Sequence, residues 1–243
     1  MTPVVINRVS VSTASVTVSG LNYFVQNSDD GLHVSADGKI TVANINASSN
    51  GNLISGDVHG DDGADLLTTA VGSAVTLTGT NTFAQNYDAG LYVSSAGAIT
   101  ASNVNSTYNQ FGAQLFNNIN TTKQNNVTLS GTNFFNFNDA DGLDVRSYGI
   151  ISVNNLTAND NGQVAHSGNG AILDSCNSLD YSALTPVCVT TTAKAITLTG
   201  YVNVSDNYNR GLQVYNLGAV TLSNIFANGN GNVGLHIDRK SVV

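Results

Sequence analysis

The 243-residue sequence contains no Trp, no Glu, one Met, two Pro and two Cys. Charged residues make up 10% of the chain, against roughly 25% in an ordinary soluble domain. A chain with no Glu and 8 Lys and Arg lacks the residues from which stable amphipathic helices are built. The formal net charge of −8 excludes a nucleic-acid binder, because such proteins need clustered Lys and Arg.

Long hydrophobic runs are also absent, and no stretch of 18 apolar residues predicts insertion into a membrane. The hydrophobic content of 41% is nevertheless too high for a disordered chain. The abundant residues are Asn, with 34 copies, and Gly, with 24. This composition predicts a folded, β-rich chain.

An internal repeat organises the sequence. Segments beginning at Val16, Val75, Val127 and Ile196 align without gaps, and each has Gly, ten residues, Gly-Leu, and a further Gly seven residues after the second Gly. A looser unit starts 24 residues after each of these positions, at Ile40, Ile99, Ile151 and Val220. The chain therefore predicts a single domain over residues 1–243, with about eight coils arranged as four two-coil repeats.

Apolar and polar residues alternate within each coil, as in Val75-Thr76-Leu77-Thr78, which predicts strands with one buried side. The fifth residue of each unit is always Gly or Asn, the residues that best tolerate a left-handed backbone, so a turn of fixed geometry is expected there. A second column holds one Asn per coil and predicts a structural ladder of stacked amides. Its members are Asn27, Asn50, Asn86, Asn109, Asn138, Asn161, Asn207 and Asn230.

A coil of this length cannot bury its apolar side alone, so the coils are expected to stack at ~4.8 Å into a rod of roughly 38 Å. Phe24, Phe83 and Phe135 fall in one column of alternate coils and are expected inside. The pattern VTLTGTN-F-x-x-N-x-x-x-GL-V-S-x-G-x-IT resembles the coils of right-handed parallel β-helix proteins of the pectate-lyase-like superfamily. More narrowly, it is similar to tandem units of repeat-rich secreted and surface proteins of environmental bacteria. The resemblance implies an all-β, right-handed parallel β-helix (β-solenoid) and specifies no activity.

Cys176 and Cys188 bracket the longest insertion, residues 174–193. Two cysteines around one loop predict a disulfide and an oxidising, extracellular or cell-surface location. Two unrelated thiols are the alternative. Met1 is not followed by a signal peptide, so if the disulfide forms, a mature portion or an excerpt of a longer secreted chain is expected.

Neither end of the repeat carries a helical or charged cap, although repeat proteins normally cap their terminal units. A bare coil end is an open strand edge. Either flanking coils of a longer chain cover these edges, or copies of the protein stack end to end, which would give fibres because such a contact does not close.

Two outward faces and one insertion are candidate sites. The second position of the coils reads Thr17, Thr41, Thr76, Thr100, Thr128, Ser152, Thr197 and Thr221, a regular hydroxyl face of the kind that ice-binding β-solenoids present. The alternative is that Thr is simply a good exposed strand residue. The strands after the Gly-Leu turns mix aromatic and polar residues and form a candidate glycan face, with an ordinary solvated surface as the alternative. Its residues are Tyr92, Phe116, Asp144, Arg146, Gln213 and Tyr215.

The insertion SGDVHGDDGAD carries Asp57, Asp61, Asp62 and Asp65 on a Gly-rich segment, which makes Ca²⁺ a candidate ligand. Its spacing matches no known calcium repeat, so a solvated acidic loop is the alternative. No other cofactor is expected.

The uniform coils favour a non-enzymatic structural or adhesive role outside the cell, in which the protein acts through its shape and surfaces. The alternative function is a carbohydrate-binding or carbohydrate-active module of the polysaccharide lyase or hydrolase type, but the carboxylates that such enzymes need are not matched. The third is ice binding. Expected partners are the protein itself, flanking coils, or surface glycans.

Overall fold

The computed structural model describes residues 5–6, 14–51, 61–118, 124–176 and 192–239. Within these ranges the regular elements are 23 β-strands, and every pairing between them is parallel. None of the described residues forms a helix that is long and apolar enough to cross a membrane. The expected all-β class with parallel sheets is therefore confirmed.

The strands form two sheets. The nine-stranded sheet A contains β1 (Val5–Ile6), β4 (Leu32–Ala36), β7 (Ala64–Thr68), β10 (Ala89–Ser95), β13 (Phe111–Phe116), β16 (Leu143–Arg146), β18 (Ala171–Asp174), β20 (Leu212–Asn216) and β23 (Leu235–Arg239). One part of sheet B contains β2 (Val16–Val18), β5 (Ile40–Ala43), β8 (Val75–Thr78), β11 (Ile99–Ser102), β14 (Val127–Ser130), β17 (Ile151–Thr157), β19 (Ile196–Asn203) and β21 (Val220–Leu222). The other part contains β3 (Asn22–Val25), β6 (Ile45–Ser48), β9 (Asn81–Ala84), β12 (Val104–Thr107), β15 (Asn133–Phe134) and β22 (Ile225–Phe226).

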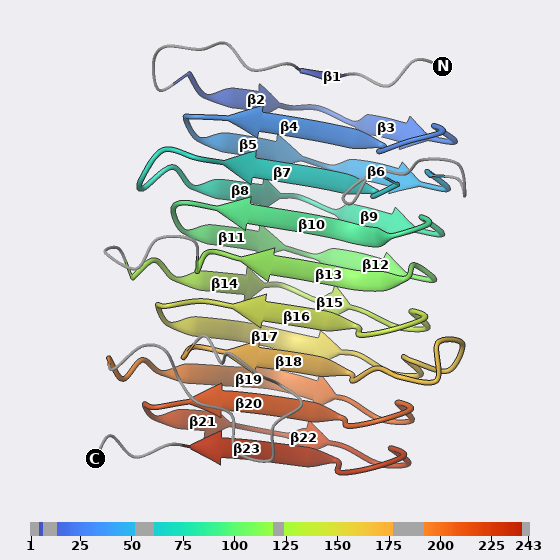
Figure 1. Cartoon of the computed structure of the whole chain (residues 1–243), viewed down its shortest axis with the longest axis vertical. Helices are drawn as coiled ribbons and strands as arrows, with labels where there is room; N and C mark the ends of the chain where they lie inside the picture. Colours follow the sequence, from blue (N-terminus) through green and yellow to red (C-terminus); the bar gives the residue numbers. More distant parts are fainter. Residues whose placement is uncertain (1–4, 7–13, 52–60, 119–123, 177–191, 240–243) are drawn as a thin grey trace.

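Each coil follows the same path. In most coils two strands of sheet B run one after the other in one direction, and one strand of sheet A returns in front of them, as β2, β3 and β4 do (Figure 1). In two coils a single long strand, β17 or β19, runs along both parts of sheet B. The next coil repeats this path one strand spacing further along. Stacked parallel strands with a repeat of this kind are compatible with a β-solenoid.

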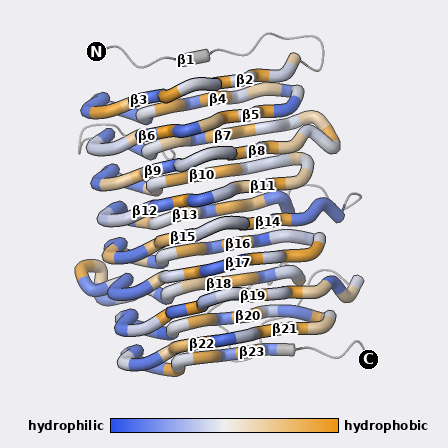
Figure 2. The backbone as a smooth tube through the Cα atoms, turned by 180° about the vertical axis from the view of Figure 1, so that it is seen from behind, coloured by the Kyte–Doolittle hydropathy of each residue, from blue (hydrophilic) through white to orange (hydrophobic). Residues whose placement is uncertain are grey.

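Strand register places equivalent repeat positions on top of one another. Thr41 pairs with Thr76, Thr76 with Thr100, and Thr100 with Thr128, as the sequence alignment predicts. The inward residues beside them are fully buried between the two sheets in one continuous core. Hydropathy accordingly alternates along many of the strands, as expected for strands with one buried side (Figure 2).

The Gly/Asn column lies in a left-handed turn between the two parts of sheet B. All eight residues have positive φ, from +46° to +87°, at Gly20, Asn44, Gly79, Asn103, Gly131, Asn155, Gly200 and Asn224. Gly and Asn alternate for a further reason. The Asn44 Nδ2 donates to the Gly20 carbonyl (3.2 Å), and the Asn44 Oδ1 accepts from the Thr80 amide (3.2 Å). A Cβ on Gly79 would lie 2.1 Å from that Oδ1, so an Asn in one coil requires Gly in the next.

The asparagine column forms a continuous ladder from Asn27 to Asn230. In each step the Nδ2 and the backbone amide of one Asn donate to the Oδ1 of the Asn one coil away, at 2.9–3.3 Å. From Asn50 onward, each Nδ2 also donates to a carbonyl of the preceding coil, for example Asn109 to Phe83 (3.2 Å). The ladder thereby satisfies polar groups in buried turns.

Seven glycines of Gly-Leu or Gly-Ala pairs make room for this ladder. A Cβ on these glycines would lie 2.5–2.8 Å from the Nδ2 of the ladder asparagine in the next coil. The affected residues are Gly31, Gly63, Gly90, Gly112, Gly142, Gly170 and Gly211.

Large and small side chains alternate in one inward column. Phe24 pairs with Ala47, Ala47 with Phe83, and Phe83 with Ser106. Phe83 is fully buried because its neighbours above and below are small. This alternation, together with the Gly/Asn column, explains why the sequence repeat spans two coils.

Candidate functional site

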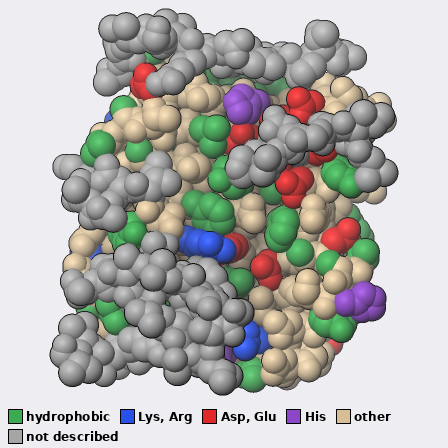
Figure 3. Space-filling model, in the orientation of Figure 1, with side chains coloured by type: hydrophobic (Ala, Val, Ile, Leu, Met, Phe, Trp, Pro, Cys, Tyr) green, Lys and Arg blue, Asp and Glu red, His purple; other side chains and the backbone are tan. Residues whose placement is uncertain are grey.

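The outward side of sheet A carries several ionisable and aromatic side chains. Strand register places one outward column here, which reads His33, Asp65, Tyr92, Gln114, Asp144, Ile172, Gln213 and His236. A second column, two residues further along, reads Ser35, Leu67, Ser94, Phe116, Arg146, Asp174, Tyr215 and Asp238. In the space-filling view of this side, acidic side chains and a histidine are visible toward its N-terminal end and basic side chains lie further along (Figure 3).

The N-terminal end of this face holds a histidine between two carboxylates. The Nδ1 of His33 lies 3.4 Å from the Asp30 Oδ2 and 2.9 Å from the Asp65 Oδ2. Hydrogen bonds to Asp30 and to Asp65 raise the pKa of His33 to about 10, so the imidazole is a cation at neutral pH. Sequence reasoning missed this group because Asp30 belongs to the turn before the strand. The signal was a second acidic residue, Asp62, at the same place in the next coil.

The acids of the predicted calcium loop do not form a solvated cluster. Asp61, Asp62 and Asp65 are 1–3% exposed, while Asp57 lies outside the described residues. The backbone amide of Asp62 donates to the Asp30 Oδ1 (2.9 Å), and the Ala89 amide donates to the Asp62 Oδ1 (2.8 Å). The carboxylates of Asp30 and Asp62 therefore accept hydrogen bonds from backbone amides of the next coil.

A group of three potential ligands does exist in the described part of the chain. One ligand atom each from Asp30, His33 and Asp65 lies within 4.8 Å of the others. One imidazole nitrogen and two carboxylate oxygens suit Zn²⁺ or a similar transition metal better than Ca²⁺, which takes oxygen ligands. The same geometry is that of an ion pair between His33 and two carboxylates.

Among the acids of this region, Asp62 has the most strongly shifted pKa. Burial raises its pKa to about 10, and the negative charges of Asp88, Asp30 and Asp65 add to the effect. The carboxyl is therefore protonated at neutral pH in the folded protein, although in an unfolded chain it is ionised above pH ~4.

This shift predicts that stability falls as pH rises. In the folded state Asp62 and His33 keep protons that they release in the unfolded state above pH ~4 and ~6.5, respectively. The stabilising contributions of these protons are therefore lost as pH approaches 10.

Asp62→Asn keeps the acceptor for the Ala89 amide and needs no proton. We expect this variant to be more stable than the wild type by about 1–3 kcal/mol at pH 8 and to show a flatter dependence of Tm on pH. Calorimetry between pH 5 and 9 measures both effects, with the exposed Asp206→Asn as control. Equal slopes for wild type and Asp62→Asn would contradict the assignment.

The middle of the face combines two aromatic rings with one ion pair. The rings of Tyr92 and Phe116 meet edge to face with centroids 5.8 Å apart, and the Arg146 guanidinium lies 4.9 Å from the Phe116 centroid. The Arg146 Nη2 also donates to the Asp144 Oδ2 (2.7 Å). Tyr92, Phe116 and Arg146, three of the residues predicted for a glycan face, are half-buried and lie side by side.

The other three residues of the predicted glycan face point outward but are not accessible. Asp144, Gln213 and Tyr215 are 2–3% exposed, although an outward strand position predicted exposure. Tyr215 belongs to a second small apolar cluster with Ile172 and Cys176, and the Gln213 Nε2 donates to its hydroxyl. A glycan could therefore contact only the side chains in the middle of this face.

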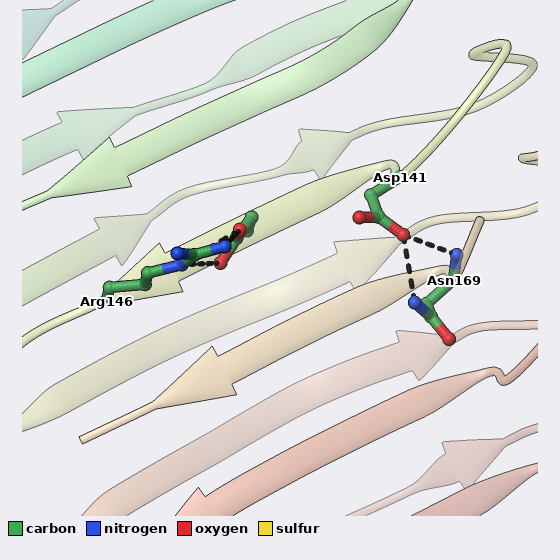
Figure 4. A network of polar contacts seen from close by, with 4 residues as sticks. Asp141, Arg146 and Asn169 are labelled. Carbon is green, nitrogen blue, oxygen red and sulfur yellow. Dashed lines mark hydrogen bonds and ion pairs between the residues drawn. The ribbon is translucent and has the colours of Figure 1, made fainter. Parts of the chain in front are cut away.

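The carboxylates of Asp144 and Asp141 accept hydrogen bonds from neighbouring residues. Burial raises the pKa of Asp144 to about 6, against the opposing effect of Arg146. Figure 4 shows the neighbouring Asp141, whose Oδ1 accepts from the amide (2.6 Å) and the Nδ2 (2.9 Å) of Asn169. Asp144 and Asp141 are thus each hydrogen-bonded to a neighbouring side chain.

The hydroxyl column and the cysteine pair are two further predicted sites. The second-position hydroxyls form an in-register column on the outward side of sheet B, half-buried or exposed in every coil. Cys176 is fully buried two residues after β18, and Cys188 lies outside the described residues, so the disulfide stays a prediction.

Comparison with known proteins gives no match to a protein-family model, a curated protein or a solved structure.

Proposed function

We propose that the protein is a non-enzymatic structural or adhesive β-solenoid that acts outside the cell as a stiff rod. The observation that supports this most directly is the asparagine ladder, which continues through all eight coils together with the core columns. We further propose that the coil is right-handed, as the resemblance to pectate-lyase-like proteins implies and as nearly all parallel crossover connections are. The predicted Cys176–Cys188 disulfide supports the location.

The proposal includes stacking of coils from one molecule to the next, or onto further coils of a longer chain. Leu235 and Ile237 of β23 continue the inward column of β20, yet they are 37% and 41% exposed. Their partners Leu212 and Val214 are fully buried. An exposed core column with an open strand edge suits a second parallel strand of the same register.

Light scattering over a concentration series and electron microscopy test the stacking. We expect the mass to rise with concentration and rods longer than one chain to appear. A Leu235→Lys, Ile237→Lys variant should stay monomeric, because two charges would face the incoming core column. Val233→Lys, exposed but outside the strand, is the matched control. A constant monomer mass for the wild type would overturn self-association.

A second candidate function is ice binding by the hydroxyl column of sheet B. The specific observation is the register, which repeats a hydroxyl at every coil from Thr17 to Thr221. An ice-recrystallisation assay with Thr76→Lys and Thr100→Lys tests it, and recrystallisation that proceeds unhindered in the presence of the wild type would dismiss the idea.

A further inference from the structure

The corner between the second part of sheet B and sheet A contains a second left-handed column. It lies in the turns at the right of Figure 1, one residue before each ladder asparagine. All eight residues have φ between +57° and +64°, namely Gln26, Ser49, Gln85, Tyr108, Phe137, Asp160, Asp206 and Gly229. Gly, Asn and Asp adopt this conformation at the lowest cost, whereas a bulky ring does so with strain.

Two successive coils nevertheless place aromatic rings in this column. Tyr108 and Phe137 are 58% and 44% exposed. Their rings stack, with centroids 5.1 Å apart and planes inclined by 10°. Neither ring belongs to the core, and the turn itself accepts Gln, Ser, Asp or Gly in the other coils. Packing and turn geometry therefore do not explain this exposed aromatic pair.

Two hollows adjoin the pair. One, of about 560 Å³, is lined by Gln85, Tyr87, Tyr108 and Gln110 among others and has the ladder turns as its floor. The other, of about 330 Å³, is lined by Tyr108, Phe137 and Gln163 among others. Tyr108, Asp139 and Val164 line both, so the two hollows adjoin each other, and together they are here called the corner groove.

A fixed wall closes one end of the corner groove. Residues 162–167 leave the regular coil, and Val164 and Ala165 line the larger hollow. The Ala165 amide donates to the Asp139 carbonyl (3.2 Å), and the Gln163 Nε2 donates to the Asp206 carbonyl (2.8 Å). These bonds attach the wall to the coils before and after it, so the groove is largely preformed.

The lining chemistry indicates the class of ligand. Aromatic rings offer flat apolar faces, and the amides of Gln85 and Gln110 both donate and accept hydrogen bonds. The described lining residues include Asp139 and Asp160 but no Lys or Arg. An anionic polymer would therefore meet repulsion, while a sugar ring with C–H faces and hydroxyl edges matches both kinds of contact. We propose that the corner groove binds a neutral glycan, with Tyr108 and Phe137 as the stacking platform and Gln85 and Gln110 as hydroxyl partners.

This binding does not depend on the rod proposal, because the corner groove lies along the side of the solenoid and not at its ends. It also differs from the predicted glycan face on sheet A, with which it shares no residue.

Affinity electrophoresis tests the proposal with polysaccharides as probes. Galactomannan, laminarin and xylan are the neutral probes, and polygalacturonate is the acidic one. We expect at least one neutral polymer to retard the native protein and polygalacturonate to retard it less. Tyr108→Ala, Phe137→Ala should weaken the binding about tenfold or more. The matched control is Tyr201→Ala, Phe226→Ala, because these exposed rings also pair, with centroids 5.2 Å apart, outside the groove.

The outcomes are distinct. Loss of retardation in the groove variant but not in the control, with both melting like the wild type, supports the proposal. No retardation by any neutral polymer, or equal retardation of the groove variant and the wild type, overturns it. Stronger, salt-sensitive retardation by polygalacturonate would overturn the neutral class of ligand.

Discussion

Asn109→Ala is expected to be among the most destabilising single substitutions in this protein. Asn109 Oδ1 accepts hydrogen bonds from the Asn86 amide and Nδ2, both at 2.9 Å, and its Nδ2 donates to the Phe83 carbonyl. Truncation removes the acceptor of the Asn86 amide and one donor to the Phe83 carbonyl in a buried turn, and the Asn86 Nδ2 keeps only its bond to the Ala47 carbonyl. Each buried group that loses a partner costs about 1–3 kcal/mol, so we expect a loss of about 3–5 kcal/mol.

A fall in Tm of roughly 6–20 °C corresponds to this loss for a chain of this size. Scanning calorimetry measures it. Asn105→Ala is the matched control, because Asn105 lies in the same coil on the outward side of β12 and is partly exposed. A loss no larger than that of Asn105→Ala would show that water replaces the ladder at little cost.

Gly112→Ala is expected to lower the free energy of unfolding by about 3 kcal/mol, because there is no room for the added side chain. The added Cβ would lie 2.2 Å from the Gly142 carbonyl oxygen and 2.8 Å from the Asn138 Nδ2. The first of these atoms is backbone and cannot rotate away, so neighbouring coils must separate. Since Gly112 has no positive φ, strain in its own backbone does not contribute.

Gly20→Ala tests the need of glycine for a left-handed backbone separately from the steric need at Gly112. Gly20 has φ of +87° and open space around the position of a Cβ, so only backbone strain of about 1–2 kcal/mol is expected. Urea or thermal unfolding compares the variants. If Gly20→Ala proved as damaging as Gly112→Ala, contact with the ladder would not be the reason for glycine in the Gly-Leu pairs.

The repeat made much of this fold predictable. When one position recurs in every coil, its residue types report one environment eight times, which is why the ladder column and the left-handed Gly/Asn column could be read from the sequence. The fourth repeat illustrates the limit. Asn22, Asn81 and Asn133 occupy the seventh position of their units, whereas Val202 occupies it in the fourth unit, where the pairing with β17 shifts register between Asn154 and Leu156.

The candidate sites were less predictable, because they depend on residues that do not repeat. Outward alternation predicted that Tyr215 and Asp144 would be accessible, whereas both are buried on the outer side of sheet A. The group of Asp30, His33 and Asp65 joins a turn residue to two strands. Nothing in the strand period distinguishes the left-handed position of Tyr108 and Phe137 from an ordinary strand end.

The alternation of Phe with Ala or Ser in the inward column sets the unit by which such a protein can grow. Inserting one coil beside Phe83 would place Phe against Phe, or Ala against Ala, and would set Gly against Gly or Asn against Asn in the left-handed turn. Inserting two coils preserves both sequences of contacts. Duplication and designed lengthening should therefore succeed in coil pairs, and a chain altered by an odd number of coils should have a packing defect at the junction.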